Sequence, residues 1–133
     1  MPKLILIKKR PDFLHVNRNG LKVVKSGLIL QAAPTKRVFD PPVFRIGYTA
    51  TKKIGNAVCR NRAKRRLRAV CRALMPREAV AGYDYVVIAR YSTAEREYDK
   101  LYKDMKFALR EIRQEIHGDV ETADTSKSER AGV

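Results

Sequence analysis

The residues that could do chemistry in this chain are the cations between positions 52 and 68, KKIGNAVCRNRAKRRLR. Eight of these seventeen residues are Lys or Arg, and no Asp or Glu occurs anywhere between Asp40 and Glu78. Arg can bind a phosphate through two parallel hydrogen bonds or stack on an unpaired base, whereas Lys acts as a mobile point charge. The stretch therefore predicts binding to a phosphate-rich polymer.

Helical periodicity separates these cations from a narrow apolar seam. At 3.6 residues per turn, one side of a helix over 56–75 would be apolar. That seam consists of Cys59, Ala63, Leu67, Val70 and Leu74. The opposite side, here called the basic face, consists of Arg60, Asn61, Lys64, Arg65, Arg68 and Arg72, with Arg62 and Arg66 on the flanks. Like charges four residues apart cost about 0.2–0.5 kcal/mol per pair, which favours phosphates as their partners over a merely solvated face.

The loop before this helix adds to the positive potential. Asn56 is a suitable N-cap, and Lys52 and Lys53 lie beside the expected helix N-terminus, where anions are favoured. Gly55 either keeps bulk away from a bound anion or is an ordinary turn residue. Phe13 is similarly ambiguous, because it could be a stacking platform for a base or a core residue.

Groups that could hydrolyse a phosphodiester bond are few and scattered. His15 and His117 lie near opposite ends of the chain, Asp40 and Asp84 are isolated, and most other carboxylates follow the basic segment. A protein nuclease needs a positioned acid and base or a carboxylate metal site. We therefore predict no catalytic residue and no metal site in this chain.

Length and charge restrict the class of protein. The 133 residues suit one domain, and a net charge of +15 calls for a polyanionic partner: nucleic acid, an anionic membrane or an acidic protein. No apolar run approaches the roughly 20 residues that span a membrane, and no signal peptide is evident, so we expect a cytoplasmic protein without a membrane partner. Cys59 and Cys71, about 18 Å apart on one helix, are expected to be core residues and not a disulfide.

Hydrophobic periodicity predicts the elements that position the basic segment. We expect a short helix at 11–16, two strands within 21–33 that break at Ser26-Gly27, a half-buried strand at 43–51, the basic helix ending at Pro76, a strand at 83–91, and a helix from about Ala94 to Gly118. Residues 1–10 are expected to be a poorly ordered lead-in. The order α-β-β-β-α-β-α predicts an α+β fold, a two-layer α/β sandwich in a single domain of residues 1–118. Residues 119–133 are expected to be a polar, disordered tail.

The basic segment resembles the signature of the bacterial ribonuclease P protein subunit, an Arg-Asn-Arg stretch on a helix after a Lys-Lys-x-Gly loop. Arg60, Asn61 and Arg62 match the signature, and Lys64, Arg65 and Arg68 match the cations after it. The family's residues just before the signature are matched by Lys52, Lys53, Gly55, Ala57 and Val58. A looser resemblance extends over residues 12–113.

The resemblance implies a protein that assists removal of the 5′ leader from precursor tRNA, by hydrolysis of one phosphodiester bond. In that family a large RNA is catalytic and uses Mg²⁺, and the protein binds this RNA and the single-stranded leader. The family fold has a left-handed β-α-β crossover and a leader cleft between the sheet and the first helix. Transferred by position, the RNA-binding residues are Lys52, Lys53, Arg60, Asn61, Arg62, Lys64, Arg65 and Arg68, with Phe13 in the cleft. Asn17 and Gln31 depart from the apolar or aromatic cleft residues of some members.

Two other functions compete with this one. A structural RNA-binding protein, such as a ribosomal component, would share the charge but would not need a leader cleft. A DNA-binding protein would place the basic helix in the major groove, but the sequence has no evident helix-turn-helix partner or dimer element. We therefore expect RNA and not DNA as the partner.

Overall fold

In the computed structural model, which describes residues 4–122, five strands form one sheet and three α-helices pack on it. The elements in chain order are β1 (Ile5–Leu6), α1 (Arg10–Asn19), β2 (Leu21–Val24), β3 (Leu28–Pro34), β4 (Arg45–Thr49), α2 (Ala57–Glu78), β5 (Tyr83–Ala89) and α3 (Tyr98–Thr122), with a 3₁₀ turn at Lys52–Ile54 before α2. The strand order across the sheet is β1-β4-β5-β3-β2. The predicted α+β class and the break between β2 and β3 are confirmed.

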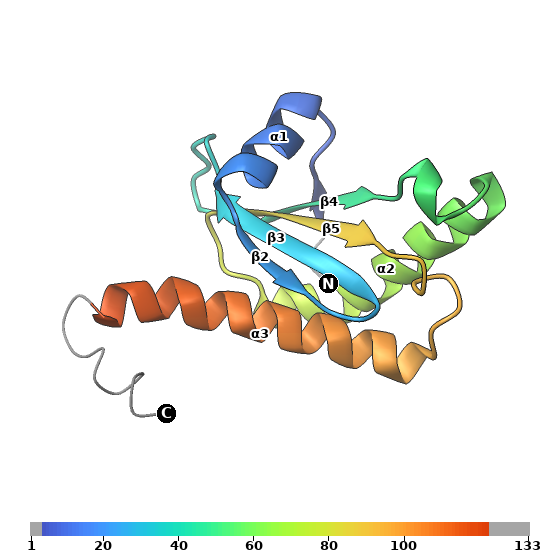
Figure 1. Cartoon of the computed structure of the whole chain (residues 1–133). Coiled ribbons are helices and arrows are strands. Elements are labelled where there is room, and N and C mark those ends of the chain that lie inside the picture. Colours follow the sequence, from blue (N-terminus) through green and yellow to red (C-terminus); the bar gives the residue numbers. More distant parts are fainter. Residues whose placement is uncertain (1–3, 123–133) are drawn as a thin grey trace.

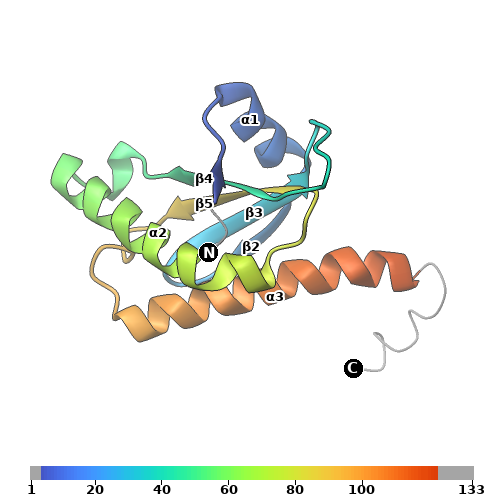
Figure 2. The same cartoon turned by 180° about the vertical axis from the view of Figure 1, so that it is seen from behind.

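The two layers of helices lie on opposite faces of the sheet (Figures 1 and 2): α1 on one face, and α2 with α3 on the other. The main core lies beneath α2 and α3, where Ile46, Leu67, Tyr85 and Leu109 are fully buried. A smaller apolar cluster beneath α1 consists of Ile7, Val16, Ala33 and Val86. The short α1 leaves part of its face of the sheet available to solvent, which is where a groove forms.

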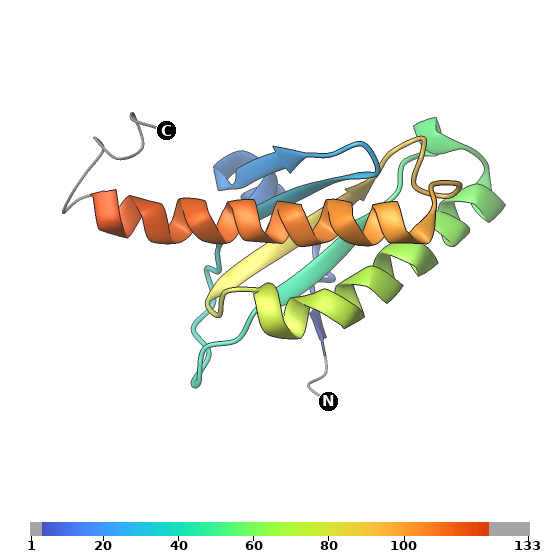
Figure 3. The same cartoon turned by 90° about the horizontal axis from the view of Figure 1, so that it is seen from below.

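The connection from β4 through α2 to β5 is a left-handed crossover. β4 and β5 are parallel neighbours, with Ile46 paired to Tyr85 and Gly47 to Val86. Figure 3 views the sheet from the side of α2, and β5 lies to the left of β4 when both strands are turned to point upward. About 98% of such connections are right-handed. The handedness that the family resemblance implied is therefore present.

Four predicted boundaries were wrong. Pro76 does not end α2, which continues to Glu78, because buried Leu74 and Met75 anchor the last turn and the Ala79 N–H still bonds to the Met75 carbonyl. Gly118 does not end α3, which continues to Thr122. A glycine costs a helix only about 1 kcal/mol relative to alanine, too little to stop it alone.

The third wrong boundary is the lead-in. Ile5–Leu6 forms a strand that pairs in parallel with β4, and Ile7 is buried, so residues from Leu4 onward belong to the fold.

The fourth wrong boundary is the start of the last helix, which begins at Tyr98 rather than Ala94, because residues 90–97 form a loop. Residues 123–133 of the predicted tail lie outside the described residues, and the domain boundary at 118 stays a prediction.

Candidate nucleic-acid interface

The basic helix α2 is fixed by its cap and its apolar seam. The Asn56 side-chain oxygen accepts a hydrogen bond from the Cys59 N–H at 2.9 Å, which confirms the predicted N-cap. Cys59 is half-buried, and the other four seam residues are fully buried, joined by Cys71 and Met75. The seam is therefore wider than the sequence suggested, and it fixes which side of the helix points outward.

The basic face lies on the surface as predicted. Asn61, Arg65, Arg68 and Arg72 are exposed, and no ion pair within residues 4–122 uses any cation of this face. The Nε of Arg60 is buried without a hydrogen-bond partner among these residues. Unpaired cations in this number form a strong anion-binding surface.

Arg68 also contacts an aromatic residue that the sequence did not identify as part of the site. Its guanidinium carbon lies 5.6 Å from the centre of the Tyr48 ring, within cation–π range. Burial, and to a smaller extent the nearby Cys71 thiol, raises the pKa of Tyr48, so the phenol stays neutral. The contact orients one cation of the basic face. In the sequence, Tyr48 alternates with Arg45 and Gly47 and shares a face with the apolar Phe44 and Ile46, so the pattern indicates a core residue and does not reveal this role.

Arg62 and Arg66, on one flank of α2, are bonded to the protein itself. Arg62 Nε donates to the Ala94 carbonyl oxygen at 2.8 Å. Arg66 Nη1 donates to the Thr93 carbonyl at 2.7 Å, and its Nη2 donates to the Arg96 carbonyl. The structure thus separates the cations of the segment into an open face and a flank that is bonded to the 90–97 loop.

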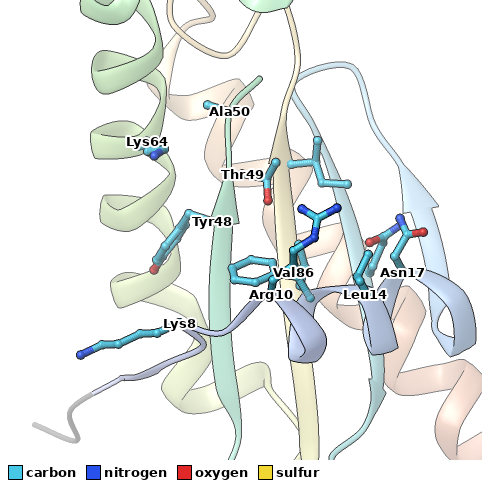
Figure 4. A pocket seen from close by; sticks show the side chains of 12 residues that line it. Lys8, Arg10, Leu14, Asn17, Tyr48, Thr49, Ala50, Lys64 and Val86 are labelled. Atoms are coloured by element: carbon cyan, nitrogen blue, oxygen red, sulfur yellow. The ribbon is translucent and has the colours of Figure 1, made fainter. Parts of the chain in front are cut away.

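A groove of about 590 Å³ lies between α1, the open part of the sheet and α2. Figure 4 shows the side chains that line it from several elements, among them Leu14 and Asn17 of α1, Thr49 of β4 and Lys64 of α2. Its cationic members are Lys8, Arg10 and Lys64. Lys8 and Arg10 were missed because they fall in the segment predicted to be a lead-in, although the run Lys8-Lys9-Arg10 was a signal for them.

Phe13 lines this groove and also packs against the smaller core. Its ring lies directly over Gly47 of β4: a Cβ at position 47 would be 2.6 Å from Phe13 Cε1 and 2.7 Å from Cζ. The two interpretations of Phe13 are thus combined, since one part of the side chain packs on the sheet and another part lines the groove.

Gly47→Ala is expected to displace the Phe13 ring and lower the free energy of unfolding by about 1–3 kcal/mol, the usual cost of overpacking. Urea denaturation checks this value. If the clash with the ring is the cause, the same substitution should cost much less in a Phe13→Leu background. Equal costs in both backgrounds would contradict the direct contact.

Gln31 and Asn17, the two departures from the family pattern, both line the groove. Gln31 is 6% exposed, and no hydrogen bond of its side-chain amide is found within residues 4–122. Its neighbour in register on β5 is Val86, which also lines the groove. An amide with free donors and acceptors therefore lies among apolar side chains, where a ligand's polar edge could bond to it.

The remaining polar candidates are dispersed. Lys52 and Lys53 are exposed on the 3₁₀ turn that leads into α2. His15 donates from Nε2 to the Pro34 carbonyl and accepts at Nδ1 from the Asn19 amide, while His117 is on α3. Residues 4–122 contain no group of three or more His, Cys, Asp or Glu side chains placed to bind a metal ion. Within the same range, no helix is long and apolar enough to cross a membrane.

Comparison with known proteins gives consistent matches. The family model described as Ribonuclease P matches residues 1–113. A protein of Paramagnetospirillum magneticum named "Ribonuclease P protein component" is 47% identical over 111 residues, covering 83% of this chain and 84% of the relative. One of the same name from Erythrobacter litoralis is 43% identical over 112 residues, covering 84% and 88%. The solved RNase P protein of Staphylococcus aureus is 28% identical with a TM-score of 0.68, covering 81% of this chain and 94% of that one.

Proposed function

Because the chain belongs to the ribonuclease P protein family, we propose that it is the protein subunit of the cytoplasmic enzyme that removes the 5′ leader from precursor tRNA. In this proposal the chain binds the catalytic RNA and the single-stranded leader and makes no bond-breaking contribution itself. The large RNA carries the reaction and uses Mg²⁺. The absence of a metal-binding cluster within residues 4–122 fits that division of labour but does not test it.

The observation that carries this proposal is the place of Lys64. It belongs to the basic face of α2 and also lines the groove beside α1. The two surfaces are therefore contiguous, and one RNA complex can contact both at once. A structured RNA backbone against the helix and a single strand in the groove would meet at this residue.

The basic face and the turn before it suit the catalytic RNA. Backbone phosphates dominate the affinity of such contacts. The residues assigned to this contact are Lys52, Lys53, Arg60, Asn61, Lys64, Arg65 and Arg68. Arg62 matches the same family signature, but its Nε is bonded to Ala94, and a different role is proposed for it below.

The groove suits an unpaired strand. Single-stranded RNA is recognised by stacking on aromatic rings and by hydrogen bonds to base edges. Phe13 and Tyr48 offer rings, Gln31 and Asn17 offer amides, and Lys8 and Arg10 offer charge for the strand's phosphates. With as many amides as aromatic rings in the lining, we expect base-edge hydrogen bonding to contribute more than in a purely aromatic cleft.

The test is cleavage of precursor tRNA by the family's catalytic RNA at low Mg²⁺, with and without this protein. We expect strong stimulation, and affinity that rises as the single-stranded leader is lengthened. Tight RNA binding without stimulation would replace this proposal with a structural RNA-binding role. Stimulation that ignores leader length would leave the subunit assignment in place and remove the groove from it.

A further inference from the structure

The 90–97 loop between β5 and α3 is bonded to three other parts of the fold. It lies beside the N-terminal half of α2 at one end of the sheet (Figures 2 and 3). On the α2 side, three N–H groups of Arg62 and Arg66 donate to the backbone carbonyls of Thr93, Ala94 and Arg96. Two arginines of the basic segment therefore supply hydrogen-bond donors to three backbone carbonyls of the loop.

The same loop is bonded to the turn between β2 and β3. Thr93 Oγ1 donates to the Gly27 carbonyl at 2.6 Å and accepts from the Arg90 N–H at 2.7 Å. Ser92 Oγ donates to the Ser26 carbonyl, and Arg90 Nη1 donates to the Lys25 carbonyl, both at 2.7 Å. Thr93 is fully buried, so its own two hydrogen bonds are shielded from water, whereas those of Ser92 and Arg90 lie at the surface.

A third connection reaches α3. Arg96 Nε bonds to Asp104 at 2.7 Å, and the same Asp104 oxygen accepts the Gly27 N–H at 2.9 Å. The loop is thus the point where α2, the β2–β3 turn and α3 are bonded to one another. The orientation of α2 relative to the sheet depends on it at this end.

We propose that Arg62 and Arg66 are positioning residues: through the 90–97 loop they fix the angle of α2, and hence the basic face, relative to the groove. The inference rests on the proposed function, in which one RNA complex engages both surfaces. In this proposal Arg62 and Arg66 bond to the protein's own backbone and do not contact phosphates, although they lie in a cationic stretch. Arg62 and Arg65 are both exposed, but no hydrogen bond or ion pair of the Arg65 side chain is found within the described residues, so Arg65 serves as the matched control.

The chemistry favours arginine at position 66. A guanidinium presents several donors in a fixed plane and can bond two carbonyls at once, whereas an ammonium is a point charge on a flexible chain. Arg66→Lys should therefore fail to restore the contacts while keeping the charge. Because a bond from a charged donor is worth more than a neutral one, its loss should speed local opening about tenfold.

The experiment compares Arg66→Lys and Arg62→Ala with Arg65→Ala in three measurements. Hydrogen exchange at the amides of residues 93–96 reports the loop. The slope of log affinity against log salt, measured for binding to the catalytic RNA, reports how many phosphates the protein contacts. The ratio of affinities for precursor tRNA with long and short leaders, in the assembled complex, reports whether the two surfaces are aligned. A misplacement of about 1 Å can cost as much as ~10²-fold in such alignment.

For Arg66→Lys and Arg62→Ala we expect about tenfold faster loop exchange, a wild-type salt slope and a several-fold smaller leader effect. For Arg65→Ala we expect wild-type exchange and leader effect, with a slope lower by about one. A lower slope in Arg62→Ala with unchanged exchange would make Arg62 a phosphate ligand and overturn the inference. Wild-type exchange and leader effect in Arg66→Lys would overturn it as well. A wild-type protein without any leader effect would instead contradict the proposed groove function.

Discussion

Replacing Arg45 by Met is expected to lower the free energy of unfolding by about 3–5 kcal/mol, because it leaves buried carboxylates without their counter-charge. Arg45 Nε and Nη2 bond to the two oxygens of Asp84 at 2.8 and 2.5 Å, and Nη1 lies 3.5 Å from Asp12. Arg45 is 6% exposed and Asp84 only 1%. The hydrogen bonds that Arg45 donates to Asp84 raise the pKa of the Arg45 guanidinium, so Arg45 stays charged.

The control for this prediction is Arg37→Met. Arg37 also approaches Asp12, at 3.7 Å, but its side chain is about half exposed. An exposed ion pair contributes only about 0–1 kcal/mol. Urea denaturation followed by circular dichroism measures both variants. Losses of similar size in the two would contradict the special cost of unpairing Asp84.

The double variant Arg65→Ala, Arg68→Ala is expected to lower the slope of log affinity against log salt for the catalytic RNA by about two units. The reason is that each exposed arginine of the basic face neutralises one phosphate in the proposed complex. Between about 50 and 200 mM salt, the variant should therefore lose roughly tenfold less affinity than the wild type. Filter binding or fluorescence titration over a salt series measures the slope.

Two further variants test whether the change in slope depends on the position of the arginines and on their charge. Lys103→Ala removes an exposed cation of α3, outside the basic face, and should leave the slope unchanged. Arg65→Lys, Arg68→Lys keeps the charges but loses the forked donors and the stacking of Arg68 on Tyr48, so the slope should persist while affinity falls at every salt concentration. An equal slope change in Lys103→Ala would mean that net charge, and not the basic face, determines binding.

The basic helix could be predicted from the sequence nearly in full. Its N-cap, its seam and its open cationic face follow from the 3.6-residue period of the backbone and from Asn56, both local properties. The strands β4 and β5 were found for the same reason, since alternation and β-branched residues act over a few positions. The family resemblance added the crossover handedness, which no local pattern contains.

Burial of polar residues could not be predicted in this way. In the alternation of residues 43–51, Arg45 falls on the face opposite Ile46 and Tyr48, which a half-buried strand would leave open. In the structure α1 and the neighbouring strands cover that face, and Arg45 is buried with Asp84, 39 residues away. Likewise, Arg62 differs from Arg65 only because a loop about 30 residues later presents carbonyls to one flank of α2 and none to the other.

Spacing along the chain is thus enough to predict the apolar side of the basic helix, the place where the cations gather and the family that the chain resembles, because these are local properties. Packing decided which cations of α2 stay unpaired on its open face and which donate to backbone carbonyls of the 90–97 loop. It also decided that Phe13, Gln31 and Lys64 line one groove. The physical reason is that a hydrogen bond or a groove needs groups distant in sequence to meet, and only the packed chain brings them together.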